Sequence, residues 1–242
     1  DYKTKIFNRV DGFYGNVLLN LNPKLELNAG IRAENTIREL SYRTISDPIG
    51  SAYRDNNLNK LDILPSLNLK YAVNEKNNIR FAASRTITRP VLFESLPITY
   101  INADGTSEKG NADLINSTNN NVDLKFEMFP TKDELFAVTA FGKYIIDPIN
   151  EITLASSTND ISFINTGDSG HVYGIELEVR KNIFEIEGDL TNKLSTGFNA
   201  SYMKTDQELD SDKVRNETDY NINLTNKRAG FTGASDFLLN AD

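Results

Sequence analysis

The chain has 242 residues, enough for one large all-β domain or two ordinary domains. Its 26 basic and 34 acidic residues give a formal net charge of −8, which argues against a nucleic-acid-binding protein, because such proteins normally carry a basic face. The absence of cysteine excludes a disulfide framework and a thiolate metal site, and the single histidine, His171, excludes a multi-histidine metal centre.

Alternation of apolar and polar residues with a period of two begins near residue 13. Residues 13–21 alternate, Asn22-Pro23-Lys24 interrupts the pattern, and residues 25–33 alternate again. Successive side chains of a strand point to opposite faces, so each set lines one side of a sheet. A helix would need apolar residues three and four apart, and these segments lack that spacing. The sequence therefore predicts two antiparallel strands joined by a tight turn.

Seven further strands are predicted along the chain, although residues 134–146 are apolar on both faces, residues 194–202 alternate more weakly, and residues 237–241 are the start of a strand. The seven strands cover residues 67–73, 79–84, 122–128, 134–146, 173–179, 194–202 and 237–241. The fold class expected is all-β, an antiparallel chain of about nine strands. The ninth strand is still in progress at the last residues, and an open sheet edge in lipid would leave backbone groups unpaired at several kcal/mol each. We therefore expect part of a larger transmembrane β-barrel.

The connections between these strands alternate between short and long. Tight turns are predicted at residues 22–24, 74–77 and 130–133, and long polar loops at 45–60, 90–119, 153–160 and 206–218. Short turns at one end and long loops at the other are typical of outer-membrane barrels. The connection 181–193 is longer than its periplasmic position predicts, and we interpret it as an insertion. No apolar run approaches the roughly 18 residues of a membrane helix.

Two alternatives to a large membrane barrel stay open from the sequence. A soluble β-sandwich, such as a carbohydrate-binding or adhesin domain, also alternates, but it would cover Leu25, Leu27 and Ile31 with a second sheet. A closed small barrel acting as an enzyme or a passive pore would need an even number of strands and a closing strand. The negative mean hydropathy of −0.43 fits a barrel as well as a soluble protein, because each barrel strand shows one face to water.

Several segments resemble the β-barrel of TonB-dependent receptors, particularly those of Bacteroidetes-type bacteria. Residues 79–90, IRFAASRTITRP, are similar to the family's strand that ends in an arginine-proline step. Phe93-Glu94-Ser95-Leu96-Pro97 stands where the family has a phenylalanine-glutamate-leucine-proline element. Gly110-Asn111-Ala112-Asp113-Leu114 resembles a glycine-asparagine-proline-aspartate-leucine motif, with Ala112 in place of proline. Residues 121–127, 140–149, 165–167 and 173–178 match the following strands in the family's order.

This resemblance implies a barrel of 22 strands with an N-terminal plug, which takes up a scarce nutrient with energy supplied by TonB. Residues 1–242 are then one domain, a partial barrel without the plug, the TonB-contacting segment and the final strand. The partners implied are outer-membrane lipid, the TonB complex through the plug, and a small nutrient such as a siderophore, vitamin, glycan or peptide. No cofactor, catalytic residue or metal site is expected, and the location implied is the bacterial outer membrane.

Charged residues on the polar side of the predicted strands are candidates for the barrel lumen: Arg32, Arg80, Glu127, Glu176, Glu178 and Arg180. Paired carboxylates are also the equipment of glycoside hydrolysis. In a barrel, however, lumen acids are solvated or paired with basic residues, and this reading is favoured. The arginines Arg80, Arg85 and Arg89 could attract an anionic ligand or pair with lumen acids such as Glu127, and in a chain of net charge −8 pairing is favoured.

The loop 90–119 is the richest candidate for contact with a ligand. It carries aromatic, amide and acidic side chains: Phe93, Tyr100, Asn102, Asp104 and Asp113. Aromatic stacking and directed hydrogen bonds together suit a polar ligand with apolar faces. The competing interpretation, given at least equal weight, is that Phe93 and Tyr100 only anchor the loop at the barrel rim. The acidic run 206–212 lacks the glycine and terminal glutamate of an EF-hand, which favours a solvated loop over a calcium site.

Overall fold

The computed structural model describes residues 3–44, 47–103, 105–154, 160–186, 192–218, 220 and 222–241. Most of them form one ten-stranded sheet, and its successive long strands are antiparallel neighbours. In sheet order the strands are β1 (Thr4–Asn22), β2 (Leu25–Tyr42), β3 (Arg54–Asn74), β4 (Asn77–Thr88), β7 (Ser117–Met128), β8 (Leu135–Ile146), β11 (Ser169–Ile186) and β12 (Asn192–Glu208), after which β13 (Arg228–Ala229) and β14 (Phe237–Ala241) both pair with β12. Each of the nine predicted strands lies in this sheet.

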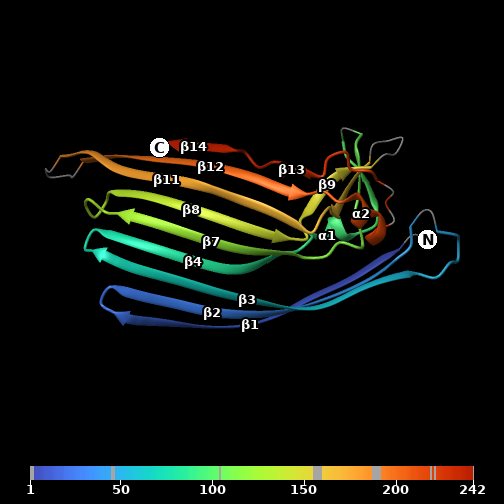
Figure 1. Cartoon of the computed structure of the whole chain (residues 1–242). Helices are drawn as coiled ribbons and strands as arrows, with labels where there is room; N and C mark the ends of the chain where they lie inside the picture. Colours follow the sequence, from blue (N-terminus) through green and yellow to red (C-terminus); the bar gives the residue numbers. More distant parts are fainter. Residues whose placement is uncertain are drawn as a thin grey trace.

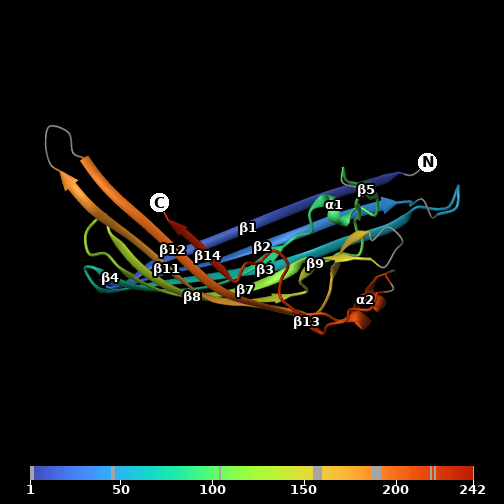
Figure 2. The same cartoon turned by 90° about the horizontal axis from the view of Figure 1, so that it is seen from above.

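The two ends of the sheet differ, as the connections predict. One end, here called the turn end, holds the hairpin turns that join β1 to β2, β3 to β4 and β7 to β8 (Figure 1). The other, the loop end, holds the long connections. They contain a second, four-stranded sheet of β5 (Thr99–Ile101), β6 (Ser107–Lys109), β10 (Ile161–Asn165) and β9 (Ile149–Thr153), and the helices α1 (Leu92–Ser95) and α2 (Ser211–Glu217). We call these six elements the loop cap. Figure 2 shows that the main sheet is curved rather than flat.

Strand pairing gives the large sheet one polar and one apolar face. Directly paired residues of antiparallel strands share a face. On one face, called the polar face, Glu26 lies directly opposite Lys70 in the strand register, and Arg80 lies opposite Lys125. On the opposite, apolar face the aligned residues include Leu27 with Leu69. The apolar face is largely bare, with large exposed side chains at Val17, Leu19, Ile31, Ile63, Ile79, Leu124, Tyr173, Ile175, Tyr202 and Leu239.

The exposed apolar face decides against a β-sandwich. Ile31 is 57% exposed, and no sheet formed by the described residues covers it or its neighbours Leu25 and Leu27. The four-stranded sheet belongs to the loop cap, which contacts the polar face instead. The large sheet also stays open, because β1 pairs only with β2 among the described strands. The structure therefore does not show a closed small barrel. Among the described residues, no helix has the length and apolar character needed to cross a membrane.

Several predicted loop boundaries were wrong because the strands continue beyond the apolar band. Strand β3 begins at Arg54, so the second half of the predicted loop 45–60 is strand paired with the extension of β2. The predicted loop 90–119 contains α1, β5 and β6, and 206–218 contains the end of β12 and helix α2. The long connection 181–193 is mainly a continuation of β11 and β12, which stay paired as far as Ile186 and Asn192. Polar strand extensions lack the apolar alternation by which strands are recognised.

Candidate functional site

The loop cap has a small core of its own. Ile164, Val214 and Ile222 are buried together, and Ile152, Leu154, Tyr220 and Leu224 pack around them. This core joins β10 to the segment around α2, which are far apart in sequence. The cap is therefore a folded unit at the loop end and not a set of independent loops.

In segment 110–114, the glycine and the asparagine each have a specific structural role in the cap. A Cβ at Gly110 would lie 2.1 Å from the carbonyl oxygen of Leu96 and 2.4 Å from that of Phe93, so only glycine allows this close backbone approach. The buried Asn111 side chain donates to the Phe163 carbonyl at 3.0 Å and accepts from the Asp113 amide at 3.0 Å. The segment that resembles a family motif is thus a structural element that fastens the cap together.

Arg38, in the polar extension of β2, fastens the cap to the main sheet. Its buried guanidinium donates to the Ser95 hydroxyl at 3.2 Å and to the carbonyls of Ala112 and Leu114 at 3.2 and 3.0 Å. Arg89 forms an ion pair with Glu34, which lies on β2 four residues closer to the turn end than Arg38. Since both Arg38 and Glu34 lie on the polar face, the cap packs against that face.

A second fastening point holds α2 to the connection after β8. The Lys213 ammonium donates to Asp147 at 2.6 Å and to Asp168 at 2.7 Å, and its side chain is only 9% exposed. Burial by itself would lower the pKa of Lys213, but the hydrogen bonds to the two carboxylates outweigh it and raise that pKa above its ordinary value. Lys213 therefore stays charged at neutral pH and keeps α2 in place.

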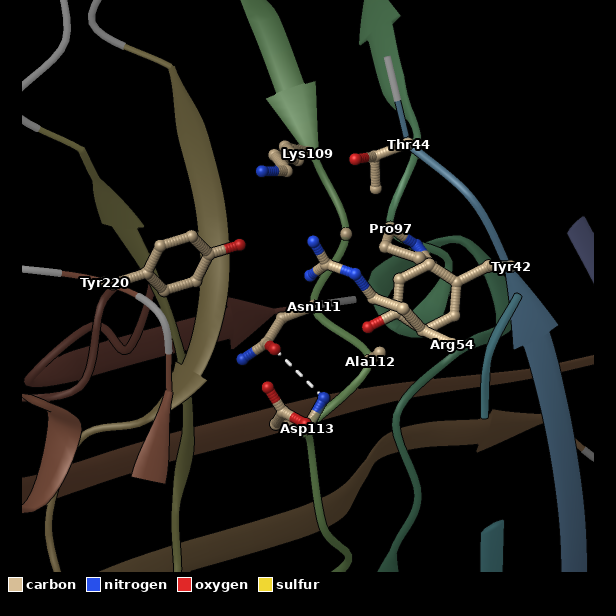
Figure 3. Close-up of a pocket in the computed structure, with 10 residues that line it drawn as sticks. Tyr42, Thr44, Arg54, Pro97, Lys109, Asn111, Ala112, Asp113 and Tyr220 are labelled. Carbon is tan, nitrogen blue, oxygen red and sulfur yellow. Dashed lines mark hydrogen bonds between the residues drawn. The ribbon is translucent and has the colours of Figure 1, made fainter. Parts of the chain in front are cut away.

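A pocket of about 190 Å³ lies in the cap beside segment 110–114 (Figure 3). Figure 3 shows the Tyr220 ring and the Tyr42 ring on opposite sides, with the Arg54 guanidinium between them. The Lys109 ammonium lies 5.8 Å from the centre of the Tyr220 ring. The lining residues are Tyr42, Thr44, Arg54, Pro97, Lys109, Gly110, Asn111, Ala112, Asp113 and Tyr220. The lining thus combines two cations, Arg54 and Lys109, with the Asp113 carboxylate and two phenol rings, so it offers both polar groups and flat apolar faces to a ligand.

Arg54 is held in position from the loop that joins β2 to β3. It donates to Asp47 at 2.7 Å, and the Thr44 amide donates to the same carboxylate at 2.6 Å. The Thr44 amide first, and then Arg54, hold the pKa of Asp47 below its usual range. Asp47 is therefore ionised at neutral pH and orients the guanidinium beside the pocket.

The predicted ligand-contacting residues lie in different environments, and among those that the structure describes Asp113 is the one that lines the pocket. Its carboxylate accepts from the Asn56 side chain at 2.9 Å. Phe93 packs edge-on against Phe163, with ring centres 5.5 Å apart. Asn102 closes the β5–β6 hairpin by donating to Thr106 and Glu108. Tyr100 is exposed on β5 and Asp104 lies outside the described residues.

The predicted polar-face residues are brought onto one side of the sheet. Strand register places all six on the polar face: Arg32, Arg80, Glu127, Glu176, Glu178 and Arg180. Arg80 pairs with Glu127 at 2.7 Å, as expected. Glu178 lies 3.8 Å from Arg180, Glu176 accepts from Asn199 at 2.7 Å, and Arg32 pairs with Glu34. These acids are held by basic and amide partners, which is the interpretation favoured over hydrolytic chemistry.

Sequence reasoning missed most of the pocket. Tyr42 and Arg54 are directly paired across β2 and β3, so recognising the strand from residue 54 onward would have brought them together. Tyr220 and Lys109 reach the pocket through the tertiary structure of the cap, and no sequence signal indicated them. Within the described part of the chain, no group of three or more histidine, cysteine, aspartate or glutamate residues is placed to hold a metal ion.

A bare apolar face, short turns and long structured loops together describe a segment of a membrane β-barrel. The family model described as "Outer membrane protein beta-barrel family" matches residues 3–242. The chain belongs to this family. Its location is the bacterial outer membrane, and its antiparallel sheet is a segment of a transmembrane barrel. No curated protein matches the sequence.

Solved structures share the fold at low sequence identity. The siderophore receptor PirA from Pseudomonas aeruginosa matches with a TM-score of 0.53 and 17% identity, over 85% of this chain and 45% of PirA. The ferric-catecholate import receptor Fiu from E. coli K12 matches with a TM-score of 0.57 and 16% identity, over 84% of this chain and 28% of Fiu. The copper transporter OprC matches with a TM-score of 0.59 and 13% identity, over 86% and 30%. The chain thus spans less than half the length of these proteins.

Proposed function

We propose that the chain is part of the barrel of a TonB-dependent receptor that takes up a scarce nutrient across the outer membrane. The observation that carries the proposal is a membrane-barrel sheet whose polar face bears a folded loop cap with a pocket of about 190 Å³. The similar folds of two receptors and a transporter support the same reading.

The proposed role is binding and passage without covalent chemistry. The receptor as a whole would have 22 strands, with a plug and a TonB-contacting segment in other parts of the protein. The barrel wall and the cap then supply ligand contacts and leave energy transfer to those parts. The Bacteroidetes-type origin implied by the sequence motifs is part of this proposal.

The ligand is proposed to enter at the loop end and to contact the cap. Asp113 contributes a carboxylate to the pocket itself, together with Arg54 and Lys109. Tyr100, exposed on β5, is proposed as a first contact at the surface, and Asp104, which lies outside the described residues, is kept in the proposal from the sequence. Phe93 and Asn102 support this arrangement by holding the cap in shape.

Deleting the gene for the full-length protein is expected to abolish growth on one nutrient in a panel of iron chelates, copper complexes, cobalamin and glycans. The reason is that a scarce nutrient too large for passive pores needs an active receptor. Growth yield on each nutrient as limiting source is the measurement. The defect should be restored by the wild-type gene and reproduced by deleting TonB.

A variant of the pocket tests, in the same growth assay, whether the cap contributes to nutrient uptake. Arg54→Gln with Lys109→Gln should raise the nutrient concentration for half-maximal growth by about tenfold, the effect of losing one good charge-assisted contact. Lys5→Gln with Lys181→Gln removes two charges elsewhere and should have no effect. Unchanged growth of the deletion strain on every nutrient would contradict the proposed uptake function.

A further inference from the structure

A small cavity of about 60 Å³ lies where the polar extensions of the main sheet meet the loop cap. Strands β1, β2 and β3 line it on one side, and the segment that contains α1 lines it on the other, together with the residue just before β7. Roughly 10–15 Å³ of such space is enough for one particle of the size of water, so the cavity holds only a few of them. It is too small for the nutrients considered above, and its occupant is therefore not the transported ligand.

Arg38 brings a buried positive charge to this cavity. It is 7% exposed, and its guanidinium donates to three uncharged acceptors. Among the described residues it forms no ion pair, and burial outweighs the distant charge of Asp113 and lowers the pKa of Arg38. Arg89, the other cation of the lining, shares the carboxylate of Glu34 with Arg32. No aspartate or glutamate lines the cavity, so the charge of Arg38 is not compensated there.

The buried side chains around the cavity carry hydrogen-bond donors in excess. Nε of Arg38 and Nδ2 of Asn116 are buried without a partner, and Asn116 is only 3% exposed. The hydroxyl oxygen of the buried Ser95 already accepts from Arg38 at 3.2 Å, so this group is able to donate its own hydrogen. The buried Thr36 hydroxyl, which accepts from Arg89 at 3.3 Å, is able to do the same. Buried donors without an acceptor are destabilising, so this lining calls for a group that accepts several hydrogen bonds.

We propose that the cavity binds one small monovalent anion, with chloride as the ion of suitable size and charge. An anion only accepts hydrogen bonds, whereas a water molecule in the same place would also need acceptors for its two hydrogens. Its negative charge offsets the buried charge of Arg38, which no carboxylate contacts. Ser95 belongs to the cap and Arg38 to β2, so the bound ion holds the cap against the barrel wall. The site does not depend on the proposed uptake function.

Amide hydrogen exchange of the full-length receptor in detergent tests the site. Replacing sodium gluconate by sodium chloride at constant ionic strength should slow exchange of residues 92–96 and 111–116 by about tenfold, the effect of an anion at roughly ten times its dissociation constant. Ionic strength is held constant because screening of other charge pairs would otherwise change with salt.

A matched pair of asparagine variants shows whether the chloride effect belongs to this cavity. Asn116→Leu removes a buried donor and should reduce the chloride effect to less than about twofold. Asn59→Leu is the control, because Asn59 is exposed on the apolar side of β3, away from the cavity, and this variant should keep the tenfold effect. Equal chloride effects in the two variants, or no effect in the parent receptor, would overturn the site. A chloride effect of the same size in the membrane strands would show a general action of the salt and would overturn it too.

Anomalous diffraction from crystals of the same receptor grown in sodium bromide locates the ion directly. A bromide peak within hydrogen-bond distance of Arg38 Nε and Asn116 Nδ2 is the expected result. An ordered water at this position without bromide density would overturn the proposal. Neither measurement uses transport, so a deletion strain without a nutrient defect would count against the uptake function alone.

Discussion

Gly110→Ala is expected to destabilise the loop cap locally while leaving the barrel assembled. The added Cβ would lie within 2.4 Å of two backbone carbonyl oxygens, those of Leu96 and Phe93, and backbone cannot rotate away as a side chain can. A shift of α1 or of the segment after β6 also disturbs the buried Asn111. We expect the cap to lose on the order of 2–4 kcal/mol of local stability.

Hydrogen exchange of the full-length receptor in detergent measures this loss. Amides of residues 92–116 should exchange roughly 30- to 1,000-fold faster, with those of the membrane strands unchanged. Gly142→Ala is the matched control, because a Cβ at that strand position meets no atom within 4 Å. Equal protection of the cap in both variants would contradict the close approach at Gly110.

Arg38→Met is expected to detach the cap from β2. The substitution removes three hydrogen bonds and leaves the carbonyls of Ala112 and Leu114 without this donor. Each buried acceptor left unpaired costs about 1–3 kcal/mol. Removing a buried charge recovers part of that cost, because its desolvation penalty disappears. The net loss expected is about 2–3 kcal/mol, confined to the contact between cap and sheet.

Protection of residues 111–116 should fall by roughly 30- to 150-fold in the Arg38→Met receptor. Arg38→Lys should rescue it poorly, because an ammonium cannot reach three separated acceptors with the fork geometry of a guanidinium. Arg9→Met, which removes an exposed pair with Asp11, should leave cap protection unchanged. Full protection in Arg38→Met would mean that the cap is held mainly by other contacts.

The sequence predicted the main sheet well because barrel strands carry a strong local signal. Leu25, Leu27 and Ile31 alternate with Glu26, Asn28 and Arg32, and lipid on one side and water on the other require that alternation. The pairing of Arg80 with Glu127 was also predictable, since charge balance on one face follows from strand order. What failed was the length of the strands beyond the apolar band, where Arg54 and its neighbours show no alternation.

The cap could not be predicted in the same way. The short strands β5, β6, β9 and β10 have at most five residues each, too few for a periodic pattern. The parallel pairing of β10 with β6 joins segments about 50 residues apart, and Tyr220 enters from still further along the chain. The local signals in the cap were the segments 93–97 and 110–114, through their resemblance to receptor motifs.

The central claim is that the sheet is a barrel wall with its apolar face toward lipid. The most direct test measures which side chains of β2 face lipid and which face water in a membrane. The chain has no cysteine, so a single cysteine with a fluorescent label can be placed at each position from 25 to 33 of the full-length receptor in lipid vesicles. Gly30 is left out, because a Cβ there would lie 2.9 Å from the Ser66 hydroxyl. Lipid-attached nitroxide should quench labels at Leu25, Leu27, Ala29, Ile31 and Ala33, and water-soluble iodide should quench those at Glu26, Asn28 and Arg32. Equal quenching by the lipid nitroxide at odd and even positions, or none at either, would contradict a barrel wall with this face toward lipid.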